Sequence, residues 1–250
     1  MPPELADRRA LVTGSSRGIG RAIAESLRAA GCRLVVNGRN AVDLAAAAAS
    51  LGATPVAGDV TRADDARRIV AEALAALGGI DILVCNVGSG RSVPPGQESA
   101  DEWQRVMALN FFSTTNMVAA ARDALTASRG TIVCISSICG LEVIPGAPVT
   151  YSAAKAALHA YVRGIARPLG GAGVRINAVA PGNILFDGSV WQRKLAENAA
   201  GVGEMLGREV ALGRLGTPAE VADVVTFLAS PRSAFATGAV WTLDGGQVRQ

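Results

Sequence analysis

Short apolar runs alternate along the chain with longer stretches in which alanine and leucine recur at helical spacing. Short runs bounded by turn residues are typical of buried strands, and the longer stretches are typical of helices. The pattern predicts strands at residues 9–14, 32–38, 53–60, 80–88, 130–137, 173–182 and 238–246. Because continuous apolar strands separated by helices favour a parallel sheet covered on both faces, we expect an α/β fold with a doubly wound sheet of about seven strands.

Helical stretches are predicted between and after these strands, at residues 18–31, 41–52, 61–79, 99–128, 150–169 and 217–230. Thr61 is expected to cap the third of them, and Thr217 followed by Pro218 marks the start of the last. Residues 183–216 are less regular and predict only two or three helical turns. No linker or shift in composition divides the chain, so a single domain is expected over residues 1–250.

The bulk composition narrows the class of protein. Apolar residues make up 50% of the chain, which is enough for a sizeable core, and the net charge is only +3. The arginines are spread from end to end, so the composition does not favour a nucleic-acid partner. No apolar run approaches membrane-spanning length, and the first residues carry charges where a signal peptide would be apolar. We therefore expect a cytoplasmic protein without a membrane partner.

The rarer side chains argue against metal sites and hydrolase chemistry. His159 is the only histidine, so neither a histidine-rich metal site nor a serine hydrolase triad is expected, and we interpret it as a packing or subunit-contact residue. The cysteines form no C-x-x-C pair and mostly lie in apolar runs, which is typical of buried reduced thiols rather than disulfides or zinc ligands. They are Cys32, Cys85, Cys134 and Cys139.

A glycine-rich turn, "TGSSRGIG" at residues 13–20, follows the first predicted strand and opens the first helix. Gly14, Gly18 and Gly20 permit a tight turn and let a phosphate approach backbone N–H groups at the positive end of a helix. Their spacing differs from the common dinucleotide-binding fingerprint, and a simple strand-to-helix turn is the alternative interpretation. In its strand–turn–helix context, the segment predicts a dinucleotide site.

The end of the second strand bears on the choice between NADH and NADPH. In NAD-binding folds of this kind, a carboxylate there binds the adenosine ribose. Here Gly38 stands near that position and Arg39 follows it, while Arg17 in the glycine turn could reach the same region. An arginine pairs with a 2′-phosphate that an acid would repel. The sequence therefore favours NADPH over NADH, with a merely solvated Arg39 as the alternative.

The stretch "VTYSAAKAALHAYV" at residues 149–162 places Tyr151 and Lys155 on one helical face. Lysine is rare here, because the chain has 22 arginines but only two lysines, Lys155 and Lys194. A nearby ammonium stabilises a phenolate, so the pKa of Tyr151 is expected to fall and its hydroxyl to serve as a proton donor or base. Lysine, unlike arginine, can also relay a proton. An unrelated pair of surface residues is the alternative.

These motifs occur in an order and at a spacing that resembles the short-chain dehydrogenase/reductase family over essentially the whole chain. The motifs are Thr13-Gly14-x-x-x-Gly18-x-Gly20, Asp59-Val60, Asn86-x-Gly88, Asn110, Ser137, Tyr151-x-x-x-Lys155, Pro181-Gly182 and the C-terminal "LDGG". The segment "LGRLGTPAEVADVVTFLAS" is similar to the branch that contains 3-oxoacyl-carrier-protein reductases. The resemblance implies a Rossmann-type fold and an oxidoreductase that uses a nicotinamide cofactor.

By that resemblance, four residues form the catalytic group. Tyr151 is the catalytic acid or base, and Lys155 contacts the nicotinamide ribose and lowers the pKa of Tyr151. Ser137 hydrogen-bonds the substrate carbonyl oxygen, with Ser136 as a rival for that role. Asn110 holds a water molecule in a proton relay to Lys155.

The resemblance also implies cofactor contacts along the ends of the strands. Asp59 and Val60 are expected at the adenine. Asn86 and Gly88 are expected near the adenosine ribose, and the backbone at Ile184 near the nicotinamide amide. The full set of expected cofactor-binding residues is Gly14, Ser16, Arg17, Gly18, Ile19, Gly20, Arg39, Asp59, Val60, Asn86, Gly88, Tyr151, Lys155, Pro181, Gly182 and Ile184.

Two positions depart from the family pattern. Val87 replaces the usual alanine beside the cofactor, and Phe186 stands where the family often has a threonine that binds it. Neither departure removes the expected catalytic group, but Phe186 puts that one cofactor contact in question.

The substrate is expected between residues 88–96, residues 139–146 and a substrate loop at about 183–213. Arg91 is interpreted as a solvated loop charge rather than a substrate contact. The three segments offer a mainly apolar wall, with simple loop packing as the alternative use of its members. These are Val93, Leu141, Val143, Ile144, Leu185, Phe186, Trp191 and Met205.

The leading hypothesis is an NADPH-dependent enzyme that reduces a ketone, such as a 3-oxoacyl thioester, to a secondary alcohol. The alternatives are an NAD(P)-dependent sugar or secondary-alcohol dehydrogenase and a cofactor-binding regulatory protein without turnover. The resemblance also implies a homo-oligomer, either a dimer or a tetramer, paired through the helices at 99–128 and 150–169.

Overall fold

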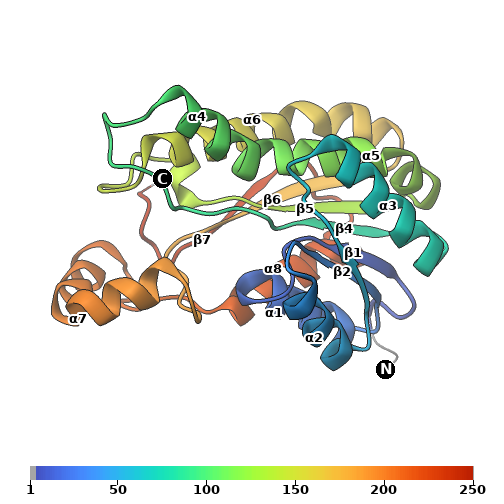
Figure 1. Ribbon diagram of the computed structural model, residues 1–250, viewed down its shortest axis with the longest axis horizontal. Helices are drawn as coiled ribbons and strands as arrows, with labels where there is room; N and C mark the ends of the chain where they lie inside the picture. Colours follow the sequence, from blue (N-terminus) through green and yellow to red (C-terminus); the bar gives the residue numbers. More distant parts are fainter. Residues whose placement is uncertain (1–3, 250) are drawn as a thin grey trace.

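The computed structural model describes residues 4–249 and is built on a parallel sheet of seven strands (Figure 1). The strand order is β3-β2-β1-β4-β5-β6-β7, so the sheet is wound outward in both directions from β1 and β4. The predicted doubly wound α/β fold is confirmed. The strands are β1 Arg9–Val12, β2 Arg33–Gly38, β3 Thr54–Ala57, β4 Ile82–Cys85, β5 Thr131–Ile135, β6 Arg175–Pro181 and β7 Val240–Leu243.

Helices cover both faces of the sheet (Figure 1). One layer holds α1 (Gly18–Ala29), α2 (Ala41–Leu51) and α8 (Pro218–Ala229), and the other holds α3 (Ala63–Leu77), α5 (Ser113–Ser128) and α6 (Val149–Gly171). Successive strand residues point to opposite faces, so Leu11 packs with the α3–α5–α6 layer and Val12 packs with the α1–α2–α8 layer. Each face therefore has its own buried apolar cluster, and the strands are buried on both sides, as their continuous apolar sequences predict.

The helix predicted at 99–128 is interrupted. Ser99 caps α4 (Ala100–Met107) by accepting from the backbone N–H of Glu102, and α5 follows only after a π-helical turn at Ala108–Phe112. Asn110 lies in this turn and is fully buried. Single π turns inside helices occur frequently at functional sites, and nothing in the helical spacing of the sequence marks one.

The start of α3 also differs from the prediction. Arg62, not Thr61, is the N-cap residue, and its side chain makes no capping hydrogen bond. The Thr61 hydroxyl donates instead to Oδ1 of Asp59 at 2.8 Å, because the loop after β3 turns back on itself before the helix begins. At α8 the prediction is confirmed, since Thr217 and Glu220 form a reciprocal capping box with Pro218 at the first helical position.

Residues 183–216 are more regular than predicted, and we call them the α7 arm. They contain one long helix, α7 (Val190–Glu209), with a kink at Asn198, where φ is −158° and ψ is 80°. The arm projects from the sheet at the lower left of Figure 1, away from the two helical layers. It has a small apolar cluster of its own, centred on Val202, Leu206 and Val210, which explains a helix that weak local propensity did not predict.

Two 3-10 turns, at Ile138–Gly140 (η2) and Pro231–Ser233 (η3), complete the described chain. All four cysteines are free, and three of them are buried, as the apolar context of their sequence predicts. Within residues 4–249, every helix is too short or too polar to span a lipid bilayer.

Candidate active site

The residues of the candidate site gather at the edge of the sheet where the parallel strands end. The glycine turn follows β1, Asn86 follows β4, and Ser136 and Ser137 follow β5. Because the strands run in parallel, their carboxyl ends share this edge, and segments distant in sequence meet there. The first turns of α6 bring Tyr151 and Lys155 to the same place.

Close backbone packing holds the glycine turn against the end of β4. The Asn86 amide donates to the backbone oxygens of Thr13 at 3.1 Å and Gly14 at 3.0 Å. A side chain at Gly20 would collide with the Gly14 carbonyl and the Asn86 amide, so only glycine fits there. Arg17, the N-cap residue of α1, makes no side-chain cap. The first N–H groups of α1 are thus suited to an anion, such as the diphosphate of a dinucleotide.

The α7 arm touches the glycine turn through Phe186. A Cβ built on Gly18 would lie 2.6 Å from the Phe186 ring, so ring and turn are in direct contact. Arg17 also faces the arm, because a Cβ at Gly188 would lie 3.5 Å from its Nη1. Since Phe186 carries no polar side-chain atom, the hydroxyl contact that a threonine would offer at this position is absent.

The end of β2 offers no carboxylate. Gly38 lies beside the Ser16 hydroxyl, and Nη1 of Arg39 lies 3.9 Å from Oδ2 of Asp59. The Arg39 side chain is 72% exposed, and an exposed pair at that distance contributes little. Its guanidinium therefore remains available to a phosphate group.

The remaining predicted cofactor residues differ in accessibility. Val60 is buried in the core, and its carbonyl accepts from the Asn116 amide at 3.1 Å. Ile184 is also buried, and its backbone pairs with Gly216 at the foot of the arm. Those that line the edge more openly are Gly14, Ser16, Ile19, Asn86, Gly88 and Gly182. The glycine cradle at the start of α1 fits a nicotinamide dinucleotide.

Ser137 and Tyr151 place two hydroxyl groups side by side at the end of β5. The Ser137 hydroxyl lies close enough to the Tyr151 phenol to lower its pKa, and its Oγ accepts from the backbone N–H of Cys139 at 3.2 Å. Gly90, in the loop after β4, lies against the Tyr151 ring. A carbonyl oxygen entering beside the half-buried phenol would meet both hydroxyl groups.

Lys155 lies behind the phenol and is buried. Its Nζ stands 5.8 Å from the centre of the Tyr151 ring and donates to the backbone oxygen of Ile135 at 2.9 Å. Gly88 fits between Lys155 and Asn110, because a Cβ at Gly88 would lie 3.2 Å from Nζ and 2.9 Å from the Asn110 Oδ1. The structure thus brings the two residues of the predicted relay to one spot.

The Asn110 side chain ties down the loop after β4. Its Oδ1 accepts from the backbone N–H of Ser89 at 2.9 Å, and its Nδ2 donates to the backbone oxygens of Ser89 at 3.2 Å and Val106 at 3.1 Å. These contacts position the loop that lies over Tyr151. The predicted role of Asn110 in holding a water molecule stays a prediction.

Ser136, the rival of Ser137, is engaged elsewhere. Its hydroxyl lies 2.7 Å from Nε2 of His159, whose Nδ1 lies 3.1 Å from the backbone oxygen of Gly140. A carbonyl oxygen only accepts, so Nδ1 carries the proton and Nε2 accepts from Ser136. Burial lowers the pKa of His159 to about 4, so the ring is neutral near pH 7. His159 therefore fastens η2 to α6, as a packing role predicts.

The electrostatics of the catalytic pair differ from the expectation. Burial raises the pKa of Tyr151 above its ordinary value, while its hydrogen bond with Ser137 acts in the opposite direction. The expected lowering by Lys155 is not found, because the ammonium donates to Ile135 and burial dominates at the phenol. Burial also lowers the pKa of Lys155 to about 8. Near pH 7 the phenol is protonated, and the lysine is largely protonated.

The predicted substrate wall is only partly assembled. Val143 is 94% exposed, whereas Trp191 and Met205 pack against the apolar cluster of the α7 arm. Cys139 was predicted only as a buried thiol, yet its backbone N–H donates to Oγ of Ser137 at 3.2 Å. A cysteine two residues after the predicted catalytic serine carries no motif that would have revealed this contact.

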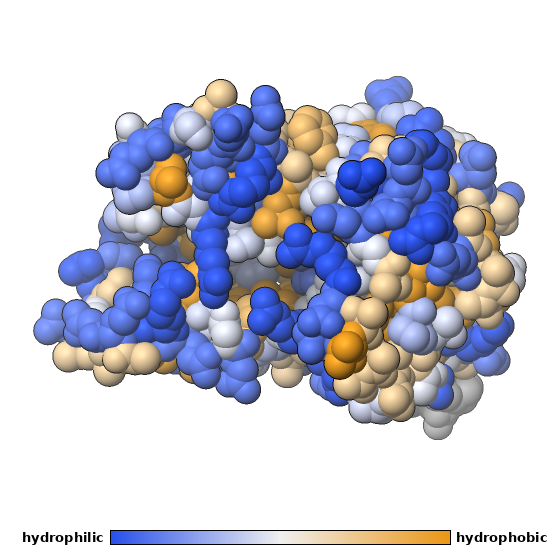
Figure 2. All heavy atoms as spheres, viewed as in Figure 1, coloured by the Kyte–Doolittle hydropathy of each residue, from blue (hydrophilic) through white to orange (hydrophobic). Residues whose placement is uncertain are grey.

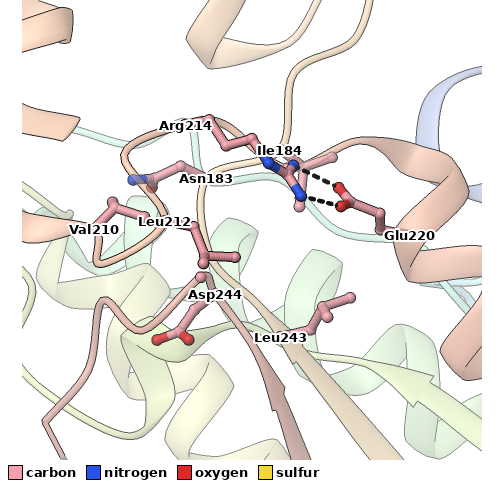
Figure 3. Close-up of a pocket in the computed structure, with 10 residues that line it drawn as sticks. Asn183, Ile184, Val210, Leu212, Arg214, Glu220, Leu243 and Asp244 are labelled. Atoms are coloured by element: carbon pink, nitrogen blue, oxygen red, sulfur yellow. Dashed lines mark hydrogen bonds and ion pairs between the residues drawn. The ribbon is translucent and has the colours of Figure 1, made fainter. Parts of the chain in front are cut away.

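A separate small pocket lies at the foot of the α7 arm (Figure 3). Arg214 and Glu220 face each other there in a two-pronged ion pair, with contacts of 3.1 and 2.6 Å. Asn183 lines the same pocket, and its Nδ2 is buried without a hydrogen-bond partner among the described residues. Within residues 4–249, its lining includes none of the predicted catalytic residues, but it does include Ile184, which was predicted to contact the cofactor.

Comparisons with known proteins agree with this geometry. A family model described as Enoyl-(Acyl carrier protein) reductase matches residues 14–247. The chain is 36% identical to a 3-oxoacyl-[acyl-carrier-protein] reductase FabG of Chlamydia muridarum, across 97% of this chain and 98% of that protein. It is 34% identical to a glucose 1-dehydrogenase of Gluconobacter oxydans, across 96% and 92% of the two chains.

Among solved structures, the fold matches an NADPH-bound short-chain oxidoreductase of Pseudomonas aeruginosa, described as containing an atypical catalytic center. The TM-score is 0.90 at 33% identity, and the match covers 98% of this chain and 99% of that one. The likeness therefore extends over both helical layers and the α7 arm.

Proposed function

Because this chain belongs to the short-chain dehydrogenase/reductase family and is an NAD(P)-dependent oxidoreductase, we propose that it reduces a ketone to a secondary alcohol with NADPH. The observation that carries the proposal is the pair of adjacent hydroxyl groups on Ser137 and Tyr151, with the buried Lys155 behind them. The similarity to 3-oxoacyl-carrier-protein reductases supports a 3-oxoacyl thioester as one candidate substrate.

The protonation of the site supports the direction of the reaction. Two donors aimed at one point are suited to the oxygen of a carbonyl, where negative charge develops as the bond is reduced. Tyr151 is a neutral phenol near pH 7, so it has a proton to give to that oxygen. Ser137 supplies the second hydrogen bond and fixes the carbonyl against the phenol.

Lys155 is suited to restore the proton that Tyr151 gives up. A pKa of about 8 leaves the ammonium largely protonated near pH 7, yet able to release a proton without great cost. Its Nζ and the buried Asn110 amide meet at Gly88, which leaves room for no side chain between them. We assign to Lys155 the relay of a proton toward Tyr151, and to Asn110 the positioning of that relay.

The preference for NADPH rests on the end of β2. Bound NADPH supplies the hydride that the carbonyl carbon accepts. Gly38 leaves no acid to repel a 2′-phosphate, and the exposed Arg39 guanidinium is available to pair with one. The NADPH found in the Pseudomonas aeruginosa relative supports the same preference.

A homo-oligomer belongs to the same proposal. Phe112, at the end of the π turn, is 47% exposed, and Val149, at the start of α6, is 44% exposed. Large apolar side chains exposed near the starts of α5 and α6 support pairing of these helices with those of a second copy.

Absorbance of NADPH and NADH, followed over a panel of ketones and 3-oxoacyl thioesters, tests the proposed function. We expect oxidation of NADPH with at least one ketone, and Tyr151→Phe should slow turnover by roughly 10²- to 10⁴-fold while cofactor binding persists. Undiminished turnover by Tyr151→Phe would show that the proton donor is a different group. Selective use of NADH would overturn the assignment of Arg39.

The similarity to a glucose 1-dehydrogenase suggests a second set of substrates for that experiment. Glucose and simple secondary alcohols are offered with NADP⁺ at alkaline pH. Rapid oxidation of a sugar, without reduction of any ketone in the panel, would replace the reductase proposal with a dehydrogenase.

A further inference from the structure

The second lysine of the chain, Lys194, is held in a defined place on the α7 arm. Its Nζ stands 4.5 Å from the centre of the Trp191 ring, one helical turn earlier. Trp191 is itself fixed, because it packs against the apolar cluster of the arm formed by Val202, Leu206 and Val210. A cation held over an indole ring loses part of its freedom and part of its hydration. The ammonium is therefore partly pre-organised before any ligand arrives.

Lys194 has no acidic partner within residues 4–249, although the neighbouring polar side chains do. Arg193 pairs with Glu197 at 3.7 Å, and Gln192 donates to Asp187 at 3.1 Å. None of the ion pairs in that part of the chain includes Lys194. In a chain that uses arginine for almost every other cation, this lysine remains available to an external anion.

The charge of Lys194 acts on Cys139, which is a direct neighbour of Ser137. Burial raises the pKa of the Cys139 thiol, and the charges of Lys155 and Lys194 act on it in the opposite direction, so Lys194 reaches the vicinity of Cys139. The backbone N–H of Cys139 in turn donates to Oγ of Ser137 at 3.2 Å. Figure 2 shows a hollow between the lobe of the α7 arm and the opposite lobe that carries α4. A substrate that extends from Ser137 past Cys139 approaches the charge of Lys194.

We propose, on the basis of the reductase function above, that Lys194 binds an anionic group of the ketone substrate. The substrate class is then a ketone that carries a carboxylate or a phosphate monoester, separated from the carbonyl by the distance between Ser137 and Lys194. The carbonyl lies at Ser137 and Tyr151 on the packed body of the protein, and the anion lies at Lys194 on the arm. The arm thereby selects charged over neutral ketones, whereas Tyr151 is indifferent to the charge.

Matched pairs of probes test this assignment. The protein is first saturated with NADP⁺. Isothermal titration then measures the affinity of methyl-ketone carboxylates, from levulinate to 7-oxooctanoate, and of their methyl esters. Hydroxyacetone phosphate beside hydroxyacetone separates a phosphate from a carboxylate as the preferred anion. The series of chain lengths covers the unknown span between carbonyl and ammonium, and binding is measured whether or not the probe is turned over.

The wild-type protein should bind at least one anionic probe more tightly than its neutral partner. Lys194→Met should reduce the affinity for that anionic probe by about tenfold, because a charge interaction is lost. The affinity for the neutral partner should change by less than about twofold. Lys194→Arg should restore most of the difference. Arg193→Met is the matched control, because it removes a neighbouring cation that already has a partner, and it should change neither probe.

Two results would overturn the assignment. In the first, the wild-type protein binds the anionic and the neutral member of every pair equally well. In the second, Lys194→Met reduces the affinity for charged and neutral probes by the same factor. The reductase function is read separately, from oxidation of NADPH by the same probes. Equal turnover of esters and acids would leave the reductase function standing while the role of Lys194 falls. Selective binding of anionic probes without turnover of any ketone would support the role of Lys194 and contradict the reductase function.

Discussion

Two regions that meet at the candidate site are built in contrasting ways. The body around β5, η2 and α6 carries Ser137, Tyr151 and Lys155, and it is continuous with the large apolar cluster that includes Leu158. The α7 arm carries Lys194 and Phe186, and its helix has a small cluster of its own centred on three buried residues. Chemistry that needs fixed geometry is thus placed on the well-packed part. Under the proposal for Lys194, the contacts that select the substrate lie on the arm, which has the smaller buried apolar cluster.

The body and the arm also differ in how their polar side chains are held in place. On the body, the buried Lys155 and His159 each have hydrogen-bond partners in the protein, which fix them in one orientation. On the arm, Lys194 is exposed and is oriented by the Trp191 ring. Substitutions on the body should therefore change either the reaction or the stability of the whole fold, whereas substitutions on the arm should change selectivity.

The largest expected effect distinguishes two neighbouring serines of the body. Ser137→Ala should reduce kcat/KM for ketone reduction by roughly 10²- to 10³-fold, because one of two hydrogen bonds to the developing oxyanion is lost. Ser136→Ala should spare turnover and reduce the free energy of unfolding by about 1–2 kcal/mol, because Nε2 of His159 loses its buried partner. Steady-state kinetics and urea unfolding of both variants check the pair. A loss of turnover confined to Ser136→Ala would exchange the two roles.

The next prediction compares packing in the two regions directly. Leu158→Ala should reduce the free energy of unfolding by about 3 kcal/mol, because a fully buried leucine of the main core leaves a cavity. Leu206→Ala, in the small cluster of the arm, should cost only about 1 kcal/mol of global stability and should mainly accelerate proteolytic cleavage within α7. Chemical denaturation and limited proteolysis measure the two effects. Equal global losses would show that arm and body unfold as one unit.

A further prediction concerns the dependence of stability on pH. His159 titrates near 6.5 in an unfolded chain and at about 4 in the folded protein, so between these values the unfolded state binds a proton that the folded state does not. The free energy of unfolding should therefore fall by about 2 kcal/mol as the pH falls from 6.5 toward 4. His159→Gln should flatten this part of the profile, measured by urea unfolding at several pH values. A slope unchanged by that substitution would place the titrating group elsewhere.

Much of the fold could be predicted because each strand is marked by a local run of apolar residues. Continuous apolar runs such as that at 130–137 need burial on both faces, which only a covered parallel sheet provides. The π turn around Asn110 could not be predicted, since it depends on how α4 and the turn itself pack against α6 rather than on local spacing. The helix α7 was missed for a related reason, because three apolar residues of its own cluster stabilise it more than propensity does.

The same division holds for the site. The sequence by itself determined which chemical groups are present: a glycine turn, two adjacent serines, and a tyrosine and a lysine at helical spacing in a chain that otherwise uses arginine. Only the tertiary structure decided what each group does. It turned Ser136 toward His159 and left Ser137 beside Tyr151, and it set the Lys194 ammonium over the Trp191 ring. The physical reason is that residue type fixes the chemistry available to a side chain, whereas burial and hydrogen-bond partners set its protonation and direction, and both depend on segments far apart in the chain.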